Sequence, residues 1–121
     1  MPPSLGHGKV CYIQIPAVDI ETSARFYAAV FGWNVRLNSD GHTAFDDGVG
    51  EVSGAWVTGR PPMSEAGLMV YIMVNDAELA IEAVKAYGGR IVQDIGGDPG
   101  EITARFLDPA GNLLGLYQDQ V

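Results

Sequence analysis

The sequence is poor in positive charge. It has 7 lysine and arginine residues against 15 aspartate and glutamate residues, so its formal net charge at pH 7 is −8. Affinity for nucleic acids comes largely from lysine and arginine contacts to phosphate, and anionic membrane surfaces attract basic segments for the same reason. The charge balance therefore argues against a nucleic acid or a membrane surface as a partner.

Cysteine and long apolar runs are also scarce. The single cysteine, Cys11, can form no disulfide within the chain and lies in an apolar stretch, which predicts a buried and unreactive thiol. No apolar run approaches the roughly 20 residues of a membrane-spanning helix. Residues 1–9 hold prolines and glycines without the apolar centre of a signal peptide. These features predict a cytoplasmic location.

The size of the chain indicates one domain, residues 1–121. Its 121 residues and 12.9 kDa fall in the commonest domain size range of about 100–150 residues. With 47% hydrophobic residues it can bury roughly two-thirds of the surface of the unfolded chain. The domain therefore needs neither a disulfide nor a metal ion to fold.

The chain contains an internal duplication. Residues 105–118 predict a β-hairpin, because two apolar strands flank the turn-forming residues Asp-Pro-Ala-Gly-Asn. Subtracting 61 from the residue number pairs Asp108 with Asp47, Gly111 with Gly50, Gly115 with Gly54, and Tyr117 with Trp56. Subtracting 56 pairs Val74 with Val18, Tyr87 with Phe31, and Gly88 with Gly32. The repeating unit is about half the chain, which is too long for a solenoid repeat.

Each half is predicted to hold one βαβββ unit, because stretches with strand alternation surround one stretch with helical spacing. In the first module, about residues 9–57, we expect strand 9–15, helix 20–31, and strands 33–37, 43–46 and 51–57. In the second module, about residues 68–118, we expect strand 68–74, a helix begun by Asn75 or Asp76 and ended by Gly88, and strands 90–93, 102–107 and 113–117. Residues 58–67 form the linker. The predicted fold class is α+β.

This pattern resembles the vicinal oxygen chelate superfamily, the group of glyoxalase I, bleomycin-resistance proteins, fosfomycin-resistance enzymes and extradiol dioxygenases. The resemblance rests on Ile15-Pro16-Ala17-Val18-Asp19, Phe26-Tyr27, Phe31-Gly32-Trp33 and Asp108-Pro109-Ala110-Gly111-Asn112. It implies curled mixed sheets that enclose a cleft between the modules, and it implies a homodimer. The modules would pair either within one chain or between subunits.

The resemblance also points to four metal-ligand positions. In the metal-dependent members these positions hold His, Glu or Gln, on the first and last strands of both modules. Carried over by spacing, they fall here on Tyr12, Gly54, Met69 (or Val70) and Gly115. A glycine offers no ligand atom, and a thioether or a neutral phenol suits a hard divalent cation poorly. We therefore expect no metal cofactor.

A cleft for a small molecule is the remaining candidate site. If the strand alternation holds, its lining is Tyr12, Gln14, Gly54, Trp56, Met69, Tyr71, Met73, Gly115 and Tyr117. Arg105 either faces this cleft, where it could hold a carboxylate or phosphate, or carries a surface charge. The competing interpretation is a filled core in which methionines occupy the gaps.

Three functions follow from these expectations. The favoured one is a metal-independent protein that binds a small hydrophobic or aromatic molecule in the inter-module cleft. The alternative is a glyoxalase-like lyase or a dioxygenase, with a non-standard metal site or with acid/base chemistry through Gln14, Tyr71 or Glu51. A third is a domain with a filled cleft that only binds a partner. The sequence identifies no catalytic residue.

Overall fold

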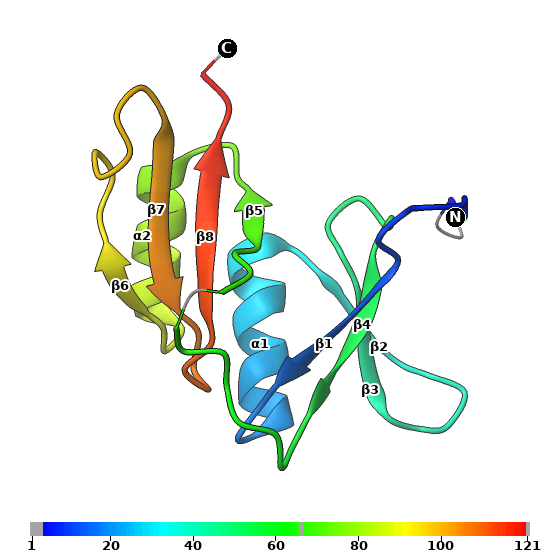
Figure 1. Ribbon diagram of the computed structural model, residues 1–121. Coiled ribbons are helices and arrows are strands. Elements are labelled where there is room, and N and C mark those ends of the chain that lie inside the picture. Colours follow the sequence, from blue (N-terminus) through cyan, green and yellow to red (C-terminus); the bar gives the residue numbers. More distant parts are fainter. Residues whose placement is uncertain (1–3, 66, 121) are drawn as a thin grey trace.

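A computed structural model describes residues 4–65 and 67–120 (Figure 1). Its elements in chain order are β1 (Tyr12–Pro16), α1 (Ile20–Phe31), β2 (Asn34–Leu37), β3 (Thr43–Asp46), β4 (Ser53–Val57), β5 (Tyr71–Met73), α2 (Ala77–Ala86), β6 (Arg90–Gln93), β7 (Ile102–Leu107) and β8 (Leu113–Gln118). The predicted order of elements is confirmed. The main difference is β5, which is shorter than the expected strand 68–74.

The strands form two four-stranded sheets. Sheet A has the order β1-β4-β3-β2, and sheet B has the order β5-β8-β7-β6. In each sheet the first strand runs parallel to the last, and the other neighbours are antiparallel. The repeated topology confirms an α+β fold of two βαβββ modules. Both sheets are open, so the curl that the resemblance implies is not present (Figure 1).

Each helix begins at an aspartate. The carboxylate of Asp19 accepts a hydrogen bond from the backbone N–H of Thr22 at the start of α1, and Asp76 does the same for Leu79 in α2. Gly32 ends α1 with a φ of 70°, a left-handed conformation that favours glycine. Within the described residues, neither helix is long and apolar enough to cross a membrane.

An aromatic cluster on α1 joins the two sheets. The Tyr27 ring stacks on Trp33 at 4.7 Å on the sheet A side, while Phe26 lies 5.9 Å from Phe106 of β7. Accordingly α1 lies between the sheets, and α2 covers sheet B (Figure 1). One core thus fills the side of each sheet that faces the helices. We call the opposite side of each sheet its outward face.

A buried polar network ties the modules together. The Asp108 side chain, 3% exposed, accepts a hydrogen bond from the Tyr27 hydroxyl at 2.8 Å and from Asn112 Nδ2 at 3.0 Å. Asn112 Nδ2 also donates to the Pro16 carbonyl at 2.7 Å, and its Oδ1 accepts from the Met63 N–H at 3.0 Å. Burial and the adjacent Asp108 carboxylate raise the pKa of Tyr27 well above its usual value. The network connects β1, α1, the linker and the β7–β8 turn.

Cys11 departs from its predicted environment. The thiol is exposed, because Cys11 lies one residue ahead of β1 and outside the strand that was expected to bury it.

Candidate functional site

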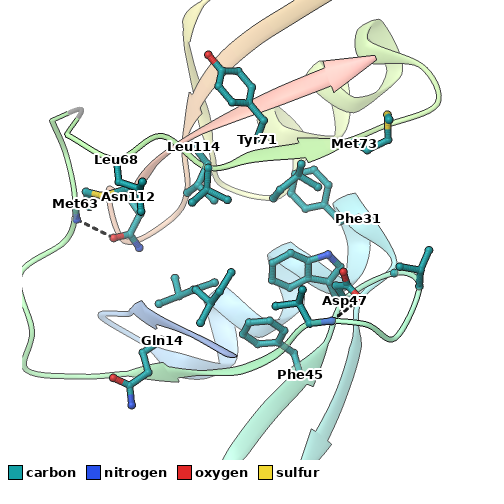
Figure 2. Close-up of a pocket in the computed structure, with 18 of the residues that line it drawn as sticks. Gln14, Phe31, Phe45, Asp47, Met63, Leu68, Tyr71, Met73, Asn112 and Leu114 are labelled. Carbon is teal, nitrogen blue, oxygen red and sulfur yellow. Dashed lines mark hydrogen bonds between the residues drawn. The ribbon is translucent and has the colours of Figure 1, made fainter. Parts of the chain in front are cut away.

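A pocket of about 620 Å³ lies between the two modules, on the helix side of both sheets (Figure 2). Its volume falls within the range of about 300–1,000 Å³ that is typical of small-molecule sites. Its apolar lining consists of Ile13, Ile15, Phe31, Trp33, Phe45, Val49, Val52, Met63, Leu68, Val70, Ile72 and Leu114. The pocket therefore offers an apolar environment large enough for a small organic molecule.

Strand alternation explains which side chains reach this pocket. On β1, Ile13 and Ile15 point to the helix side, whereas Tyr12 and Gln14 point outward. On β5, Ile72 reaches the pocket in the same way. On β1 and β5 the site residues predicted from the sequence are the outward ones, such as Tyr12 and Tyr71, so these isoleucines were missed. The sequence did contain a signal for them, because apolar β-branched residues at alternate positions, such as Ile13 and Ile15, predict the core side of a strand.

Three of the polar side chains around the pocket, those of Asp47, Asn112 and Gln14, are already hydrogen-bonded within the protein. Asp47 Oδ1 accepts from the backbone N–H of Glu51 at 2.8 Å, and Asn112 is held by the network described above. The Gln14 carbonyl oxygen accepts from Arg60 Nη1 at 2.9 Å. Because these polar groups already have partners within the protein, shape and apolar contact dominate what the pocket can recognise.

Three of the predicted site residues lie at the rim of this pocket: Gln14, Tyr71 and Met73. Figure 2 shows that their side chains point away from the pocket, toward the outward faces. Their backbones therefore contribute to the walls, while their functional groups lie on the opposite sides of the sheets.

The other predicted residues lie on or beside different sheets, whose strands do not contact each other within the part of the chain that the structure describes. Tyr12 lies on the outward face of sheet A, Met69 lies just before β5, and Arg105, Gly115 and Tyr117 lie on sheet B. In the described chain, no strand of sheet A comes within 8 Å of a strand of sheet B, measured between Cα atoms. A single chain thus does not bring the predicted residues into one cleft.

Gly54 and Trp56 face the helix side of sheet A, whereas the prediction grouped them with Tyr12 and Gln14 on the opposite face. Trp56 is buried on the helix side, where its ring lies 6.0 Å from Tyr27 and 4.8 Å from Phe45. A side chain at Gly54 would overlap the Phe45 ring and the Ile13 carbonyl oxygen. The glycine therefore makes room for core packing within the module and not for a ligand.

The unexpected orientation of Gly54 and Trp56 arises because two corresponding turns differ in length by one residue. The Asp47 N–H donates to the Val52 carbonyl, which closes a turn over residues 47–52, whereas the Asp108 N–H donates to the Asn112 carbonyl over residues 108–112. After the longer turn, the offset of 61 no longer matches equivalent positions. A slip of one residue moves a strand side chain to the opposite face. In the two parallel ladders Ala55 pairs with Gln14, and Gly115 pairs with Tyr71. Gln14 and Tyr71 each lie five residues before the aspartate that caps the next helix, so the structural equivalent of Gly115 is Ala55.

The outward face of sheet A carries a bidentate ion pair. Arg36 Nε and Nη2 each donate to Asp46 at 2.9 Å, and Ser53 Oγ donates to the same carboxylate at 2.7 Å. The hydrogen bonds from Arg36, followed by the bond from Ser53, hold the pKa of Asp46 far below its usual value of 3.8. Asp46 is consequently ionised in the folded protein at any ordinary pH.

Asp46 gives a testable pH dependence. A carboxyl whose pKa is lower in the folded state stabilises the protein above its unfolded pKa, and this contribution is lost as the pH falls. We expect Asp46→Asn to flatten the acid-induced loss of unfolding free energy below about pH 4 by roughly 1 kcal/mol or less, because the pair is partly exposed. Urea unfolding of both proteins from pH 6 to pH 2.5 measures this difference in the pH dependence of the unfolding free energy. Asp40→Asn in the β2–β3 turn is the control, and equal pH profiles for both variants would contradict the assignment.

Comparisons with known proteins find a match over nearly the whole chain. The sequence model of the Glyoxalase/Bleomycin resistance protein/Dioxygenase superfamily matches residues 9–116. The chain belongs to this superfamily. A glyoxylase-like domain-containing protein of Didymella fabae is 30% identical over 103 residues, which cover 74% of this chain and 75% of that protein.

Solved structures share the fold. FosX, a fosfomycin resistance protein of Listeria monocytogenes, has a TM-score of 0.76 at 15% identity and covers 94% of this chain and 93% of its own. TnmS3, an antibiotic binding protein of Streptomyces sp. CB03234, has a TM-score of 0.72 at 21% identity and covers 97% of this chain and 100% of its own. At these identities the likeness concerns the fold alone.

The residues at the superfamily's metal-ligand positions do not fit a divalent metal. Tyr12 offers only a neutral phenol, and Met69 only a soft thioether, while Val70 has no ligand atom. Neither Gly115 nor Ala55, which replaces Gly54 once the register is corrected, has a ligand atom in its side chain. Among residues 4–65 and 67–120, no group of three or more His, Cys, Asp or Glu side chains gathers to hold a metal ion. The lack of a metal cofactor stays a prediction.

Proposed function

We propose that the protein binds a small, mainly apolar molecule in the inter-module pocket, without a metal ion. The observation that carries the proposal is the pocket itself, about 620 Å³ in volume and lined chiefly by aliphatic and aromatic side chains. TnmS3, which shares the fold, is an antibiotic binding protein, so a binding role has a precedent on this scaffold. The volume suits a drug-sized molecule.

The proposal is tested with a pocket-filling variant. Val70 is partly buried and lines the pocket just before β5. Val70→Trp is expected to weaken binding of the neutral apolar dye Nile red about tenfold or more, because the indole occupies the volume that the dye would fill. Fluorescence titration gives the dissociation constant, and a thermal melt establishes that the variant is folded.

Two controls keep that experiment specific. Val92→Trp adds the same indole on β6, outside the pocket, and is expected to leave dye binding unchanged. Excess chelator is likewise expected to have no effect. Equal binding by wild type and Val70→Trp would refute the pocket as the site. Binding that the chelator abolishes would favour instead the metal-dependent lyase or dioxygenase.

The homodimer is a second part of the proposal. β1 and β5 are edge strands, each hydrogen-bonded to one neighbour, and Tyr12, Tyr71 and Met73 are exposed beside them. Exposed apolar side chains at open sheet edges favour association with another copy. Light scattering during gel filtration is expected to give twice the 12.9 kDa chain mass. We place the protein in the cytoplasm, which cell fractionation would check.

A further inference from the structure

The inter-module pocket has one charged side chain in its lining. Among the described residues that form its walls, Asp47 alone carries a formal charge, and there is no lysine, arginine or histidine. The remaining walls are apolar apart from a few neutral polar groups. A ligand that enters the pocket therefore meets one negative group and no positive one.

One oxygen of the Asp47 carboxylate is open to a ligand. The backbone N–H groups of Glu51 and Val52 both donate to Oδ1, at 2.8 Å and 3.3 Å, and no described residue donates to Oδ2. The Asp47 N–H donates in turn to the Val52 carbonyl at 2.8 Å, which holds the residue in a closed turn. The partly exposed carboxylate thus has a fixed position and retains acceptor capacity at Oδ2.

The carboxyl end of α1 lies next to this turn. A Cβ on Gly48 would lie 3.4 Å from the carbonyl oxygen of Phe31, the last residue of α1, and both residues line the pocket. The carbonyl groups at the end of a helix carry a partial negative charge that basic side chains often balance. The last turn of α1 holds no basic residue. The helix end and Asp47 therefore both favour a cation at this place.

The negative group lies at one end of the pocket. Figure 2 shows Asp47 at the same end as Phe31, with Met63 and Leu68 at the opposite end. None of the ion pairs of the described chain involves Asp47, so no described lysine or arginine neutralises its carboxylate. The arrangement matches a molecule with a cation at one end and an apolar body.

We infer that the ligand of the inter-module pocket is a hydrophobic amine, an apolar molecule with one protonated nitrogen. The inference rests on the pocket as the binding site, which is the function proposed above. The ammonium group donates a hydrogen bond to Asp47 Oδ2 and faces the carboxyl end of α1, while the apolar body extends toward Met63 and Leu68. Asp47 is thus the residue that determines specificity.

The physical basis of the selectivity is charge. A hydrogen bond from an ammonium group to a carboxylate is stronger than one between neutral groups. An anionic ligand of the same shape would bring a second negative charge toward Asp47 and would be rejected. The pocket is therefore expected to prefer a cation to a neutral molecule, and a neutral molecule to an anion.

The test compares three probes that share a naphthalene ring: 2-naphthylmethylamine, 2-naphthalenemethanol and 2-naphthoate. Each is titrated against Nile red bound to the full chain, at about 0.15 M salt so that long-range attraction is screened. The amine is expected to displace the dye with about tenfold or more higher affinity than the alcohol. The carboxylate is expected to bind more weakly than the alcohol.

Asp47→Asn removes the charge and keeps an oxygen that accepts from the N–H groups of Glu51 and Val52. It is expected to bring the affinities for the amine and the alcohol within about twofold of each other. Asp40→Asn is the matched control, because it changes the net charge equally in the β2–β3 turn, outside the pocket. The preference for the amine is expected to survive in that variant.

Two outcomes would overturn the inference. Equal affinity of the wild type for the amine and the alcohol is the first, and this comparison requires no variant. The second is an equal loss of the preference in Asp47→Asn and Asp40→Asn, because general attraction to an acidic protein would then explain it.

This inference and the proposed function fail in different ways. If Val70→Trp loses Nile red binding while the wild type binds the amine and the alcohol equally, the pocket is the site and only the assignment of an amine is refuted. If Val70→Trp binds Nile red as the wild type does, the pocket itself is refuted as the site.

Discussion

Replacing Asp108 by alanine is expected to lower the free energy of unfolding by about 3–4 kcal/mol. The carboxylate accepts hydrogen bonds from the Tyr27 hydroxyl at 2.8 Å and from the backbone N–H groups of Ala110 and Asn112, both at 2.9 Å. Alanine leaves these donors without an acceptor in an environment that water does not reach readily. Urea unfolding followed by circular dichroism measures the loss.

Asp47→Ala is the matched control for this prediction. Asp47 begins the corresponding turn of the first module, and its carboxylate accepts from the backbone N–H groups of Glu51 at 2.8 Å and Val52 at 3.3 Å. It is less buried and has no tyrosine partner, so we expect a loss of about 1 kcal/mol. If the two variants lose the same stability, the hydrogen bond to Tyr27 and the deeper burial contribute little.

Gly54→Ala is expected to destabilise the protein by about 2–3 kcal/mol, although it adds a single methyl group. The new Cβ would overlap the Ile13 carbonyl oxygen and the Phe45 ring. The carbonyl belongs to the parallel ladder between β1 and β4, so it cannot move without disturbing the hydrogen bonds of that ladder. Thermal and urea unfolding both report the change.

The same substitution at Gly115 provides the comparison. There the obstructing atoms belong to the Tyr71 side chain, which is 40% exposed and can turn toward solvent. We expect Gly115→Ala to cost about 1 kcal/mol or less in stability. A tolerated Gly54→Ala would contradict the packing role and restore the idea that this glycine leaves room for a ligand.

The order of elements could be predicted from the sequence because local signals mark each boundary. Asp19 and Asp76 cap the helices, and Gly32 ends the first one in a left-handed conformation. β5 was predicted too long, because residues 68–70 are as apolar as the strand itself. Val70 lines the inter-module pocket instead, a role that depends on the position of the other module.

The candidate site was harder to predict, for two physical reasons. The first is that one additional residue in the turn over 47–52 reverses the faces of β4, which the pairing of Trp56 with Tyr117 did not take into account. The second is that the pocket is formed by residues from both modules and the linker, such as Phe45, Leu114 and Met63. No local sequence pattern indicates how the two modules pack against each other.

The hydrogen bonds of Asn112 also constrain the order in which the chain can mature during synthesis. Its side chain bonds to Pro16, 96 residues earlier, and to Met63 in the linker. Contacts so distant in sequence form late, because the intervening chain must first be made and ordered. The amino-terminal module therefore leaves the ribosome with β1 able to pair with β4 but with the Pro16 carbonyl lacking its Asn112 partner. Only when the final hairpin emerges are β1 and the linker connected to the second module through Asn112, so a nascent chain that stops before residue 112 cannot complete the junction between the modules.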